Sequence, residues 1–272
     1  MRGLCQKVGM SRQNYYARRR QRQRQEVDAE LVLRLVRAER LCQPRLGARK
    51  LRHILKPALE EAGVELGRDR FFGLLRAEDL LVGRLPREWV STTCSQHKLP
   101  VYPNLIRGLA VSGPNQVWVV DLTYVRTREG FLFLALVTDK GSRKIVGYHC
   151  AETLEAGGCV LALQMALAEL PLGARPIHHS DRGTQYCSHQ YGTVLAQRGL
   201  TISMTEKNHC AENALAERMN GILKGEYGLG ARLDSKAQAR RAIDQAVQAY
   251  NQRRPHTALG LRTPEEVHCI TE

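Results

Sequence analysis

The sequence predicts an α/β fold, in which helices cover a mixed five-stranded sheet, preceded by an all-α region. Length, composition and a change of hydrophobic pattern support this prediction. The 272 residues suffice for one large domain or two modest ones, and 43% are hydrophobic and 25% charged, as in soluble globular proteins. Up to residue 83, apolar residues recur at helical spacing, whereas after residue 116 short β-branched runs alternate with helical stretches.

The predicted all-α region occupies residues 1–83. Apolar residues at helical spacing predict three helices there, over 28–41, 47–62 and 68–78. Pro57 is expected to kink or break the second helix, and Gly63 is a plausible C-cap at its end. A helix, a turn and a basic helix form a helix-turn-helix pattern, so we predict that this region binds DNA. The alternative is a small helical bundle without a DNA role, which has the same pattern.

The positive charge of the chain is concentrated in its first part. The formal net charge is +14; residues 1–110 hold 23 Lys and Arg against 11 Asp and Glu, and residues 111–272 hold 18 against 16. The first part therefore has a net charge of +12 and the second a net charge of +2. The first 25 residues hold eight basic side chains and no acidic one. This asymmetry favours a nucleic-acid partner over an ordinary solvated basic face.

Residues 84–115 separate the all-α region from the predicted catalytic core, residues 116–272. Four prolines without a clear period predict a linker or an irregular arm packed on the core. In the core, short apolar runs punctuated by glycines predict hairpin-connected strands over 116–126, 131–138 and 143–150. The later elements are a helix over 153–169 with Thr153 as N-cap, a strand over 175–180, a helix over 188–198, a strand over 200–204, and helices over 212–227 and 235–251. The order β-β-β-α-β-α-β-α-α suits a ribonuclease H-like arrangement.

Several classes of protein are excluded by the sequence. No apolar run approaches the length of a membrane span, and the N-terminal stretch lacks the apolar segment of a signal peptide. None of the eight cysteines forms a Cys-x-x-Cys pair, which argues against a zinc ribbon and against a disulfide framework. We therefore expect a cytoplasmic protein with mostly reduced cysteines and no membrane partner.

Three acidic residues lie where a fold could gather them. Asp121 lies inside an apolar strand, where a carboxylate is costly unless paired or metal-bound; the alternative is a solvent-facing strand residue. Asp181 follows the strand over 175–180, at the strand end where α/β sheets place ligands, although strand-to-loop Asp is common. Glu217 lies on the polar face of the helix over 212–227, where a solvated Glu is the alternative. Phosphodiester cleavage with two metal ions requires converging carboxylates, and Mg²⁺ prefers oxygen ligands.

Together the three acids resemble a known pattern. Thirty-five residues separate Asp181 from Glu217, the D,D-35-E spacing of integrases and transposases. The flanking text matches as well, in Trp118-Val119-Val120-Asp121-Leu122-Thr123-Tyr124, His179-Ser180-Asp181-Arg182-Gly183-Thr184-Gln185-Tyr186, Glu212-Asn213-Ala214-Leu215-Ala216-Glu217-Arg218, and Tyr250-Asn251-Gln252-Arg253-Arg254-Pro255-His256-Thr257-Ala258-Leu259-Gly260 followed by Thr263-Pro264-Glu265. On these ordered motifs, the chain is identified as a member of the insertion sequence three family of bacterial transposases, as its second reading-frame product.

The resemblance implies a DNA transposase that cleaves strands and transfers them at the ends of an insertion sequence. It implies that Asp121 bridges two Mg²⁺ ions, for which Mn²⁺ can substitute, with Asp181 on one ion and Glu217 on the other. Lys224 lies two turns after Glu217 on the same helix face and resembles a family residue that contacts phosphate; a solvated lysine is the alternative. The basic residues of the tail are expected either to bind the DNA backbone or only to position the last helix: Arg253, Arg254 and His256.

Two other functions share part of the pattern. A ribonuclease H-like nuclease without strand transfer has the same fold and metals, but the 35-residue spacing and the tail motif argue against it. A non-enzymatic helix-turn-helix regulator uses only the N-terminal helices, and the acid triad argues against it. The expected partners are the terminal inverted repeats, target DNA and further copies of the chain on that DNA. An upstream coiled-coil DNA-binding product is a further candidate partner in the nucleoid, because no sustained heptad run appears in this chain.

Overall fold

The structure is a computed structural model that describes residues 10–83, 97, 99–206 and 210–269. The chain divides into two compact units. Met1–Cys42 and Leu46–Gly83 form the first unit, and Gln43–Arg45 and Arg84–Glu272 form the second. The first is entirely helical where described and the second contains the sheet, so each is considered by itself.

Three helices form the first unit: α2 (Arg12–Cys42), α3 (Ala48–Glu61) and α4 (Arg68–Ala77). They pack around a core of leucines, valines and Phe71. The second and third lie where the sequence predicted them, but α2 begins at Arg12, long before the predicted start at residue 28. Arg and Gln are good helix formers, so the basic segment continues the helix without an apolar stripe of its own.

Pro57 does not break α3, which corrects the prediction from sequence. The helix runs through Pro57 to Glu61, and Pro57 itself is exposed. The buried leucines of α3 are spaced by single turns on both sides of the proline, which keeps the two halves of the helix on one core: Leu51, Leu55 and Leu59. Gly63 follows the helix with φ of 67°, and the N–H of Val64 donates to the carbonyl of Leu59 at 2.8 Å. This left-handed ending confirms the predicted role of Gly63.

The second unit is built on a five-stranded sheet in the order β3-β2-β1-β4-β5. Its strands are β1 (Val117–Thr127), β2 (Gly130–Asp139), β3 (Ile145–Ala151), β4 (Ile177–Ser180) and β5 (Ile202–Met204). β1, β2 and β3 pair antiparallel, whereas β4 pairs parallel with β1 and with β5. The predicted mixed sheet, its strand number and its short hairpins are confirmed.

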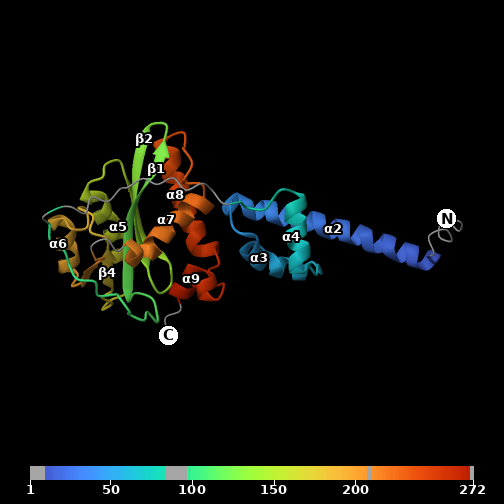
Figure 1. The fold of residues 1–272 in the computed structure, drawn as a ribbon, viewed down its shortest axis with the longest axis horizontal. Coiled ribbons are helices and arrows are strands. Elements are labelled where there is room, and N and C mark those ends of the chain that lie inside the picture. The colour runs from blue at the N-terminus through green and yellow to red at the C-terminus, as the bar shows by residue number, and fades with distance from the viewer. Residues whose placement is uncertain (1–9, 84–96, 98, 207–209, 270–272) are drawn as a thin grey trace. The chain divides into compact units, whose positions relative to one another are not determined.

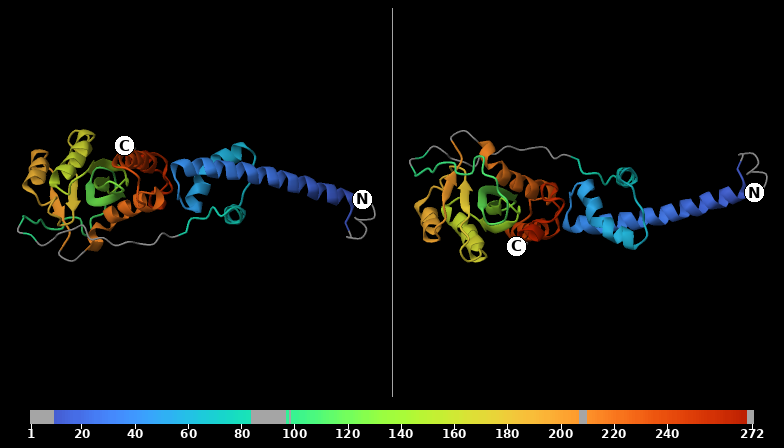
Figure 2. Two further views of the ribbon diagram at one scale, coloured as in Figure 1. Left: turned by 90° about the horizontal axis from the view of Figure 1, so that it is seen from above. Right: turned by 90° about the horizontal axis from the view of Figure 1, so that it is seen from below.

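Helices cover both faces of this sheet, as Figures 1 and 2 show. One apolar layer joins the sheet to α5 (Ala156–Ala168) and α6 (His189–Gln197), and another joins it to α7 (Ala214–Glu226) and α8 (Lys236–Arg253). The remaining short elements are η1 (Cys210–Asn213), η2 (Thr257–Leu259) and α9 (Pro264–His268).

Thr153 is not the N-cap of α5, which corrects another prediction. Glu155 holds the N-cap position, and α5 begins at Ala156. A side chain on Gly158 would approach the β-carbon of Ala151 within 2.8 Å, so the first turn of α5 lies directly against the end of β3. Because the first turn of α5 lies this close to β3, the chain turns through several residues after Ala151 before α5 begins.

The arm before the sheet has two parts. Residues 84–96 and 98, where the prediction placed the start of a linker, lie outside the described residues. Residues 99–115 contain no helix or strand and pack on the second unit. The N–H of Leu105 donates to Ser203 Oγ at 2.9 Å, and the N–H of Met204 donates to the carbonyl of Pro103 at 3.3 Å. Ile106 is buried against β1 and α7.

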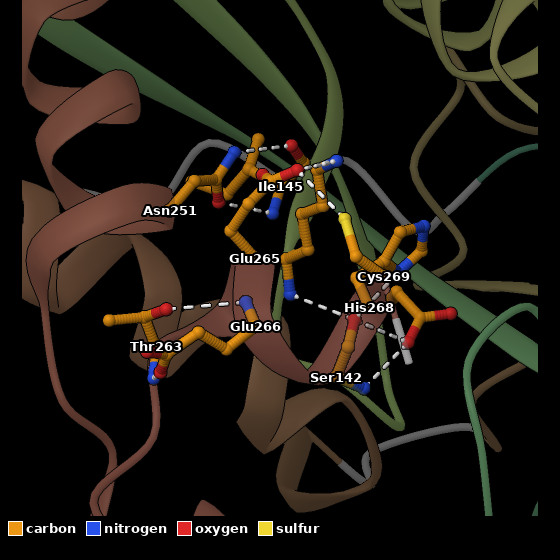
Figure 3. Close-up of polar contacts among 10 residues, drawn as sticks. Ser142, Ile145, Asn251, Thr263, Glu265, Glu266, His268 and Cys269 are labelled. Atoms are coloured by element: carbon orange, nitrogen blue, oxygen red, sulfur yellow. Dashed lines mark hydrogen bonds and ion pairs between the residues drawn. The ribbon is translucent and has the colours of Figure 1, made fainter. Parts of the chain in front are cut away.

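The tail after α7 is fastened to the turn between β2 and β3, as Figure 3 shows. Asn251 on α8 accepts the N–H of Ile145 and donates to its carbonyl, both at 2.9 Å. Ser142 in the turn bonds to His268 of α9 at 2.9 Å. A capping box between Thr263 and Glu266 begins α9. These contacts fix the C-terminal helices against the sheet.

Among the described residues, every helix is either too short or too polar to cross a lipid bilayer.

Candidate functional site: carboxylates between two parallel strands and a helix

Two parallel strands bring Asp121 and Asp181 to the same level of the sheet. The register pairs Val119 of β1 with His179 of β4, and each carboxylate stands two residues further along its strand direction. Asp121 lies within β1, and Asp181 directly follows the last residue of β4. Both are half-buried. The structure therefore places these two predicted site residues side by side.

The carboxylate of Asp121 is held by two hydrogen bonds. Oδ1 accepts the N–H of Leu122 at 2.9 Å, and Oδ2 accepts Nδ2 of Asn220 on α7 at 2.7 Å. Each oxygen has a further lone pair, so both remain able to bind a cation. The two donors fix the plane of the carboxylate before any ligand arrives.

The Asp181 carboxylate depends on a glycine. Oδ1 accepts the N–H of Gly183 at 3.0 Å. A β-carbon at position 183 would lie 3.0 Å from the same oxygen and 3.2 Å from Oε1 of Gln185. A side chain at position 183 would crowd the carboxylate, because such distances are tighter than ordinary van der Waals contact. Glycine therefore allows the backbone to approach Asp181 closely.

Glu217 is less closely associated with the pair. It lies in the first turn of α7 and is exposed. Among the described residues, no group of three or more His, Cys, Asp and Glu side chains is arranged to hold a metal ion. The structure thus brings Asp121 and Asp181 together and places Glu217 on the helix beside them, without closing the three into one cluster.

Two asparagines, one at the N-cap of α7 and one inside this helix, face the sheet rather than the solvent. Asn213 and Asn220 are buried, and Asn213 Nδ2 donates to the carbonyl of Val120 at 3.0 Å. Their side-chain oxygens, Oδ1 of each, are buried and have no hydrogen-bond partner among the residues that the structure describes. The solvated-face alternative is therefore wrong for these two residues. Buried polar groups are costly unless bonded, so the polar stripe of α7 belongs to the interior of the site.

The pKa of Asp121 is raised to about 7. Burial is the largest cause of this rise, and the negative charge of Asp181 is the second. The charge of Glu217 makes a smaller contribution in the same direction. The hydrogen bonds from Leu122 and Asn220 oppose the rise, because they favour the charged form. Two further negative groups therefore act on the Asp121 carboxylate, and a bound cation would relieve the repulsion among the three.

The raised pKa of Asp121 predicts a pH dependence of stability in metal-free protein. Between about pH 4, where an unfolded aspartate titrates, and pH 7, the folded state binds more protons than the unfolded state. The contribution of Asp121 to the free energy of unfolding therefore falls as pH rises through this range. Asp121→Asn should remove that fall. Urea unfolding of wild type and of Asp121→Asn in the presence of a chelator, at about pH 4 and about pH 8, measures the free energy of unfolding. If the two proteins differ in this free energy by the same amount at both pH values, the prediction is wrong.

Lys224 neither points freely into solvent nor pairs with Glu217. Its Nζ lies 3.9 Å from the centroid of the Tyr124 ring, and the side chain is half-buried. Burial lowers the pKa of Lys224, and the nearby charge of Asp121 partly restores it. The ammonium therefore stands close to the carboxylates, held over an aromatic ring.

The basic tail residues have different surroundings from those expected of DNA contacts. Arg254 is 2% exposed, and its Nε and Nη2 each donate to one oxygen of Glu226 at 2.7 Å. Its Nη1 donates to Nε2 of the buried His256 at 2.9 Å. Buried side chains cannot reach a phosphate, so Arg254 and His256 are not placed to contact DNA. Their hydrogen bonds with each other and with Glu226 position the end of α7 instead. Arg253 is exposed and keeps the DNA-binding prediction.

Sequence reasoning missed the positioning residues of the site. Asn220 stands three residues after Glu217, on the helix face that also carries Lys224. An Asn in a helix interior is a weak helix former, and this was the available signal for its role. Nothing in the sequence indicates that Tyr124 meets Lys224, because that contact joins a strand to a distant helix.

The comparisons with known proteins agree over almost the whole chain. Two models of the integrase core domain match, over residues 111–210 and 198–264. An uncharacterized 31 kDa protein of insertion element IS600 from Shigella sonnei is 38% identical, over 96% of this chain and 96% of its own length. The transposase InsF for insertion sequence IS3fB of Escherichia coli (strain K12) is 32% identical, over 98% of this chain and 93% of its own length.

Among solved structures, the chain is similar to one from a viral assembly. This is the cryoEM structure of the simian T-cell lymphotropic virus intasome in complex with PP2A regulatory subunit B56 gamma. The match has a TM-score of 0.51 at 18% identity and covers 83% of this chain and 76% of the other. At this identity the likeness concerns the fold alone.

Proposed function

This chain belongs to the insertion sequence three family of DNA transposases, which have an integrase catalytic core, and we propose that it cleaves and transfers DNA strands at the ends of its own insertion sequence. The observation that carries the proposal is the meeting of Asp121 with Asp181 at neighbouring parallel strands, beside the helix that bears Glu217. Acids of this kind in this arrangement serve phosphodiester chemistry.

The residues present suit hard divalent metal ions. Their donors are carboxylate oxygens, and the mutual repulsion around Asp121 is the kind that a cation relieves. Asp121, Asp181 and Glu217 would hold two Mg²⁺ ions, for which Mn²⁺ can substitute. When bound, the ions supply positive charge that stabilises the charge developing on the phosphate oxygens in the transition state.

The rest of the chain orients these acids and the DNA. Asn220 and the N–H of Leu122 set the plane of the Asp121 carboxylate. Glu217 is exposed in the first turn of α7, so it can turn toward the pair without unfolding the helix. Lys224, the half-buried cation beside Asp121, would contact a phosphate next to the cleaved bond.

A strand-transfer experiment tests the proposed function. Short duplexes that carry the ends of the insertion sequence are incubated with the full chain, Mg²⁺ and a target plasmid. We expect nicked ends and also products in which end and target are covalently joined. Nicks without joined products would favour the ribonuclease H-like nuclease, and binding without either product would favour the regulator.

Lys224→Ala should reduce joining and weaken binding to end duplexes, whereas Lys224→Arg should retain much of both, because a phosphate contact requires mainly positive charge. The reduction is expected to be about tenfold, typical of one lost charge-assisted contact. Strand-transfer and binding assays on the two variants measure it. Metal affinity measured without DNA is the control. If Lys224→Ala binds metal ions more weakly than wild type, Lys224 orders the acids rather than contacting phosphate. Equal activity of all three proteins would contradict any role.

The first unit is proposed to bind DNA through its phosphates. Residues 1–83 hold 19 Lys and Arg against 10 Asp and Glu, a net charge of +9. The N-terminal half of α2 carries five closely spaced and exposed arginines, Arg18, Arg19, Arg20, Arg22 and Arg24. A run of exposed arginines on one helix is complementary to a polyanion, and the acidic residues of α2 begin only after this run, at Glu26.

Replacing these five arginines of α2 with Gln should weaken DNA binding and flatten its salt dependence. Each lost phosphate contact removes about 0.9 from the slope of log affinity against log salt concentration on duplex DNA. Binding titrations at several salt concentrations measure the slope, and the matched variant with five Lys should keep it. If the Gln variant has the wild-type slope, these charges do not meet DNA.

The chain is further proposed to act on DNA as a homo-oligomer, assisted in recognising the ends by an upstream coiled-coil DNA-binding product. Two DNA ends must be cut and joined to one target, which suits more than one active site. Light scattering of the chain with and without end duplexes tests the first point. A footprint of the purified chain on those ends tests the second, because full protection without the other product would exclude the need for it.

A further inference from the structure

The hairpin of β1 and β2 carries two aromatic side chains, Tyr124 and Phe131, that the proposed chemistry does not use. The register pairs Phe131 of β2 with Arg126 of β1, and Tyr124 lies two residues before Arg126 on the same face. The rings of Tyr124 and Phe131 meet edge to face, with centroids 5.9 Å apart. Phe131 is 53% exposed, so part of this residue is open to solvent next to the β1–β2 turn. A flat, solvent-accessible aromatic ring is a surface on which a nucleobase can stack.

Two cations border this aromatic pair. Lys224 Nζ lies 3.9 Å from the centroid of the Tyr124 ring, and the guanidinium carbon of Arg126 lies 5.6 Å from the same centroid. We call Tyr124, Arg126, Phe131 and Lys224 the aromatic–basic surface. An apolar ring bordered by two positive charges is complementary to a nucleotide, which has a flat base and a negative phosphate. The same charges oppose pairing with the basic regions of a second copy of this chain.

The aromatic–basic surface reaches the carboxylates through α7. Lys224 stands one helical turn after Asn220, whose Nδ2 donates to Asp121 Oδ2 at 2.7 Å, and the Lys224 ammonium lies over the Tyr124 ring. Lys224 therefore connects the aromatic ring to the acids.

We propose that the aromatic–basic surface binds one unstacked nucleobase of the DNA end, next to the bond that is cut. The base lies on the ring of Phe131, and Arg126 and Lys224 contact the adjoining phosphates. The proposal rests on the proposed strand cleavage and names a substrate contact for that same site. It implies that the duplex opens locally at its end, because a paired base cannot reach a side chain in this way.

Stacking on Phe131 should be visible apart from phosphate binding. The probes are a single-stranded oligonucleotide of thymidines and a phosphodiester chain of equal length without bases. Both have the same charge, so their affinities differ only through the bases. For the full chain, the affinity ratio should favour the thymidine strand by about fivefold or more, as for one base on an aromatic ring.

Variants at position 131 assign that ratio to the ring. Phe131→Leu keeps an apolar strand residue but removes the ring, and should bring the ratio toward one with an unchanged salt slope. Phe131→Tyr should retain the ratio. Tyr102→Leu is the matched control, because Tyr102 is an exposed aromatic residue of the arm, and it should also retain the ratio. An unchanged ratio in Phe131→Leu would overturn the base site.

A strand-transfer assay on the same proteins separates this proposal from the proposed function. The base site is supported if wild type joins ends, whereas Phe131→Leu joins them less well and no longer prefers the thymidine strand over the chain without bases. The base site fails alone if wild type joins ends and Phe131→Leu keeps both its ratio and its joining. If wild type does not join ends at all, the proposed function fails, and the base site fails with it.

Discussion

Replacing any one of the three acids with its amide should abolish strand cleavage and joining while DNA binding survives. The changes are Asp121→Asn, Asp181→Asn and Glu217→Gln. Each keeps the size of the side chain but removes a charged oxygen ligand from a site proposed to hold hard divalent ions. We expect a loss of about a thousandfold or more, because metal ions contribute several kcal/mol to stabilising the transition state.

The Asp121 variant should be the best folded of the three. Its amide oxygen can still accept the N–H of Leu122, and the unpartnered Oδ1 of Asn220 can turn to accept the new amide N–H. Asp234→Asn is the matched control, because Asp234 is an exposed acid whose partner is Arg128, and its activity should match wild type. Strand transfer and duplex binding are measured in parallel. Robust Mg²⁺-dependent joining by any triad variant would remove that residue from the site.

Breaking the pair between Arg254 and Glu226 should destabilise the second unit by about 3 kcal/mol. Arg254 is almost fully buried and binds both oxygens of Glu226, so Arg254→Met leaves a carboxylate without its partner. Removing one member of a buried pair typically costs about 3–5 kcal/mol, and the lower figure applies because the Glu226 side chain is 26% exposed. Glu226 is the last residue of α7, so joining activity should fall together with stability.

Urea unfolding, followed by the fluorescence of the buried Trp118, measures this effect. Arg241→Met is the matched control, because Arg241 is an exposed arginine of α8. Arg254→Lys should recover only part of the stability, since an ammonium cannot bind both oxygens in the planar geometry of a guanidinium. If Arg254→Met and Arg241→Met unfold at the same urea concentration, the pair contributes nothing. Normal stability with weaker DNA binding would return Arg254 to the DNA-binding residues.

The sheet could be predicted because local patterns determine its strands. Apolar runs separated by glycines mark the antiparallel strands, and each strand needs only its neighbour along the chain to form a hairpin. The three acids were recognised by the ordered motifs and by the 35-residue spacing between Asp181 and Glu217, because each of them alone has an ordinary structural alternative. The start of α2 and the intact α3 were missed, because helix propensity and tertiary packing outweighed the signals read from apolar spacing and from Pro57.

The partners of charged residues could not be predicted from their positions in the chain. Arg254 was expected to bind DNA because it stands in a basic motif, but it meets Glu226 on another helix, 28 residues earlier. Asn220 lies on the same helix face as the exposed Glu217, but the sheet buries it against Asp121. Whether a polar residue faces solvent or a neighbour depends on how helices dock, and that information is spread over the entire core.

The arm before the sheet also covers part of a strand edge at which copies of the chain would otherwise associate. β5 is an edge strand, and the arm satisfies part of that edge through the contacts of Pro103 and Leu105 with Met204 and Ser203. Exposed strand edges are templates on which other chains add strands and aggregate. A catalytic fragment that starts at residue 116, where the strand pattern begins, would uncover this edge. Gel filtration should show such a fragment assembling into large species, whereas a fragment that starts at residue 99 should remain in small ones.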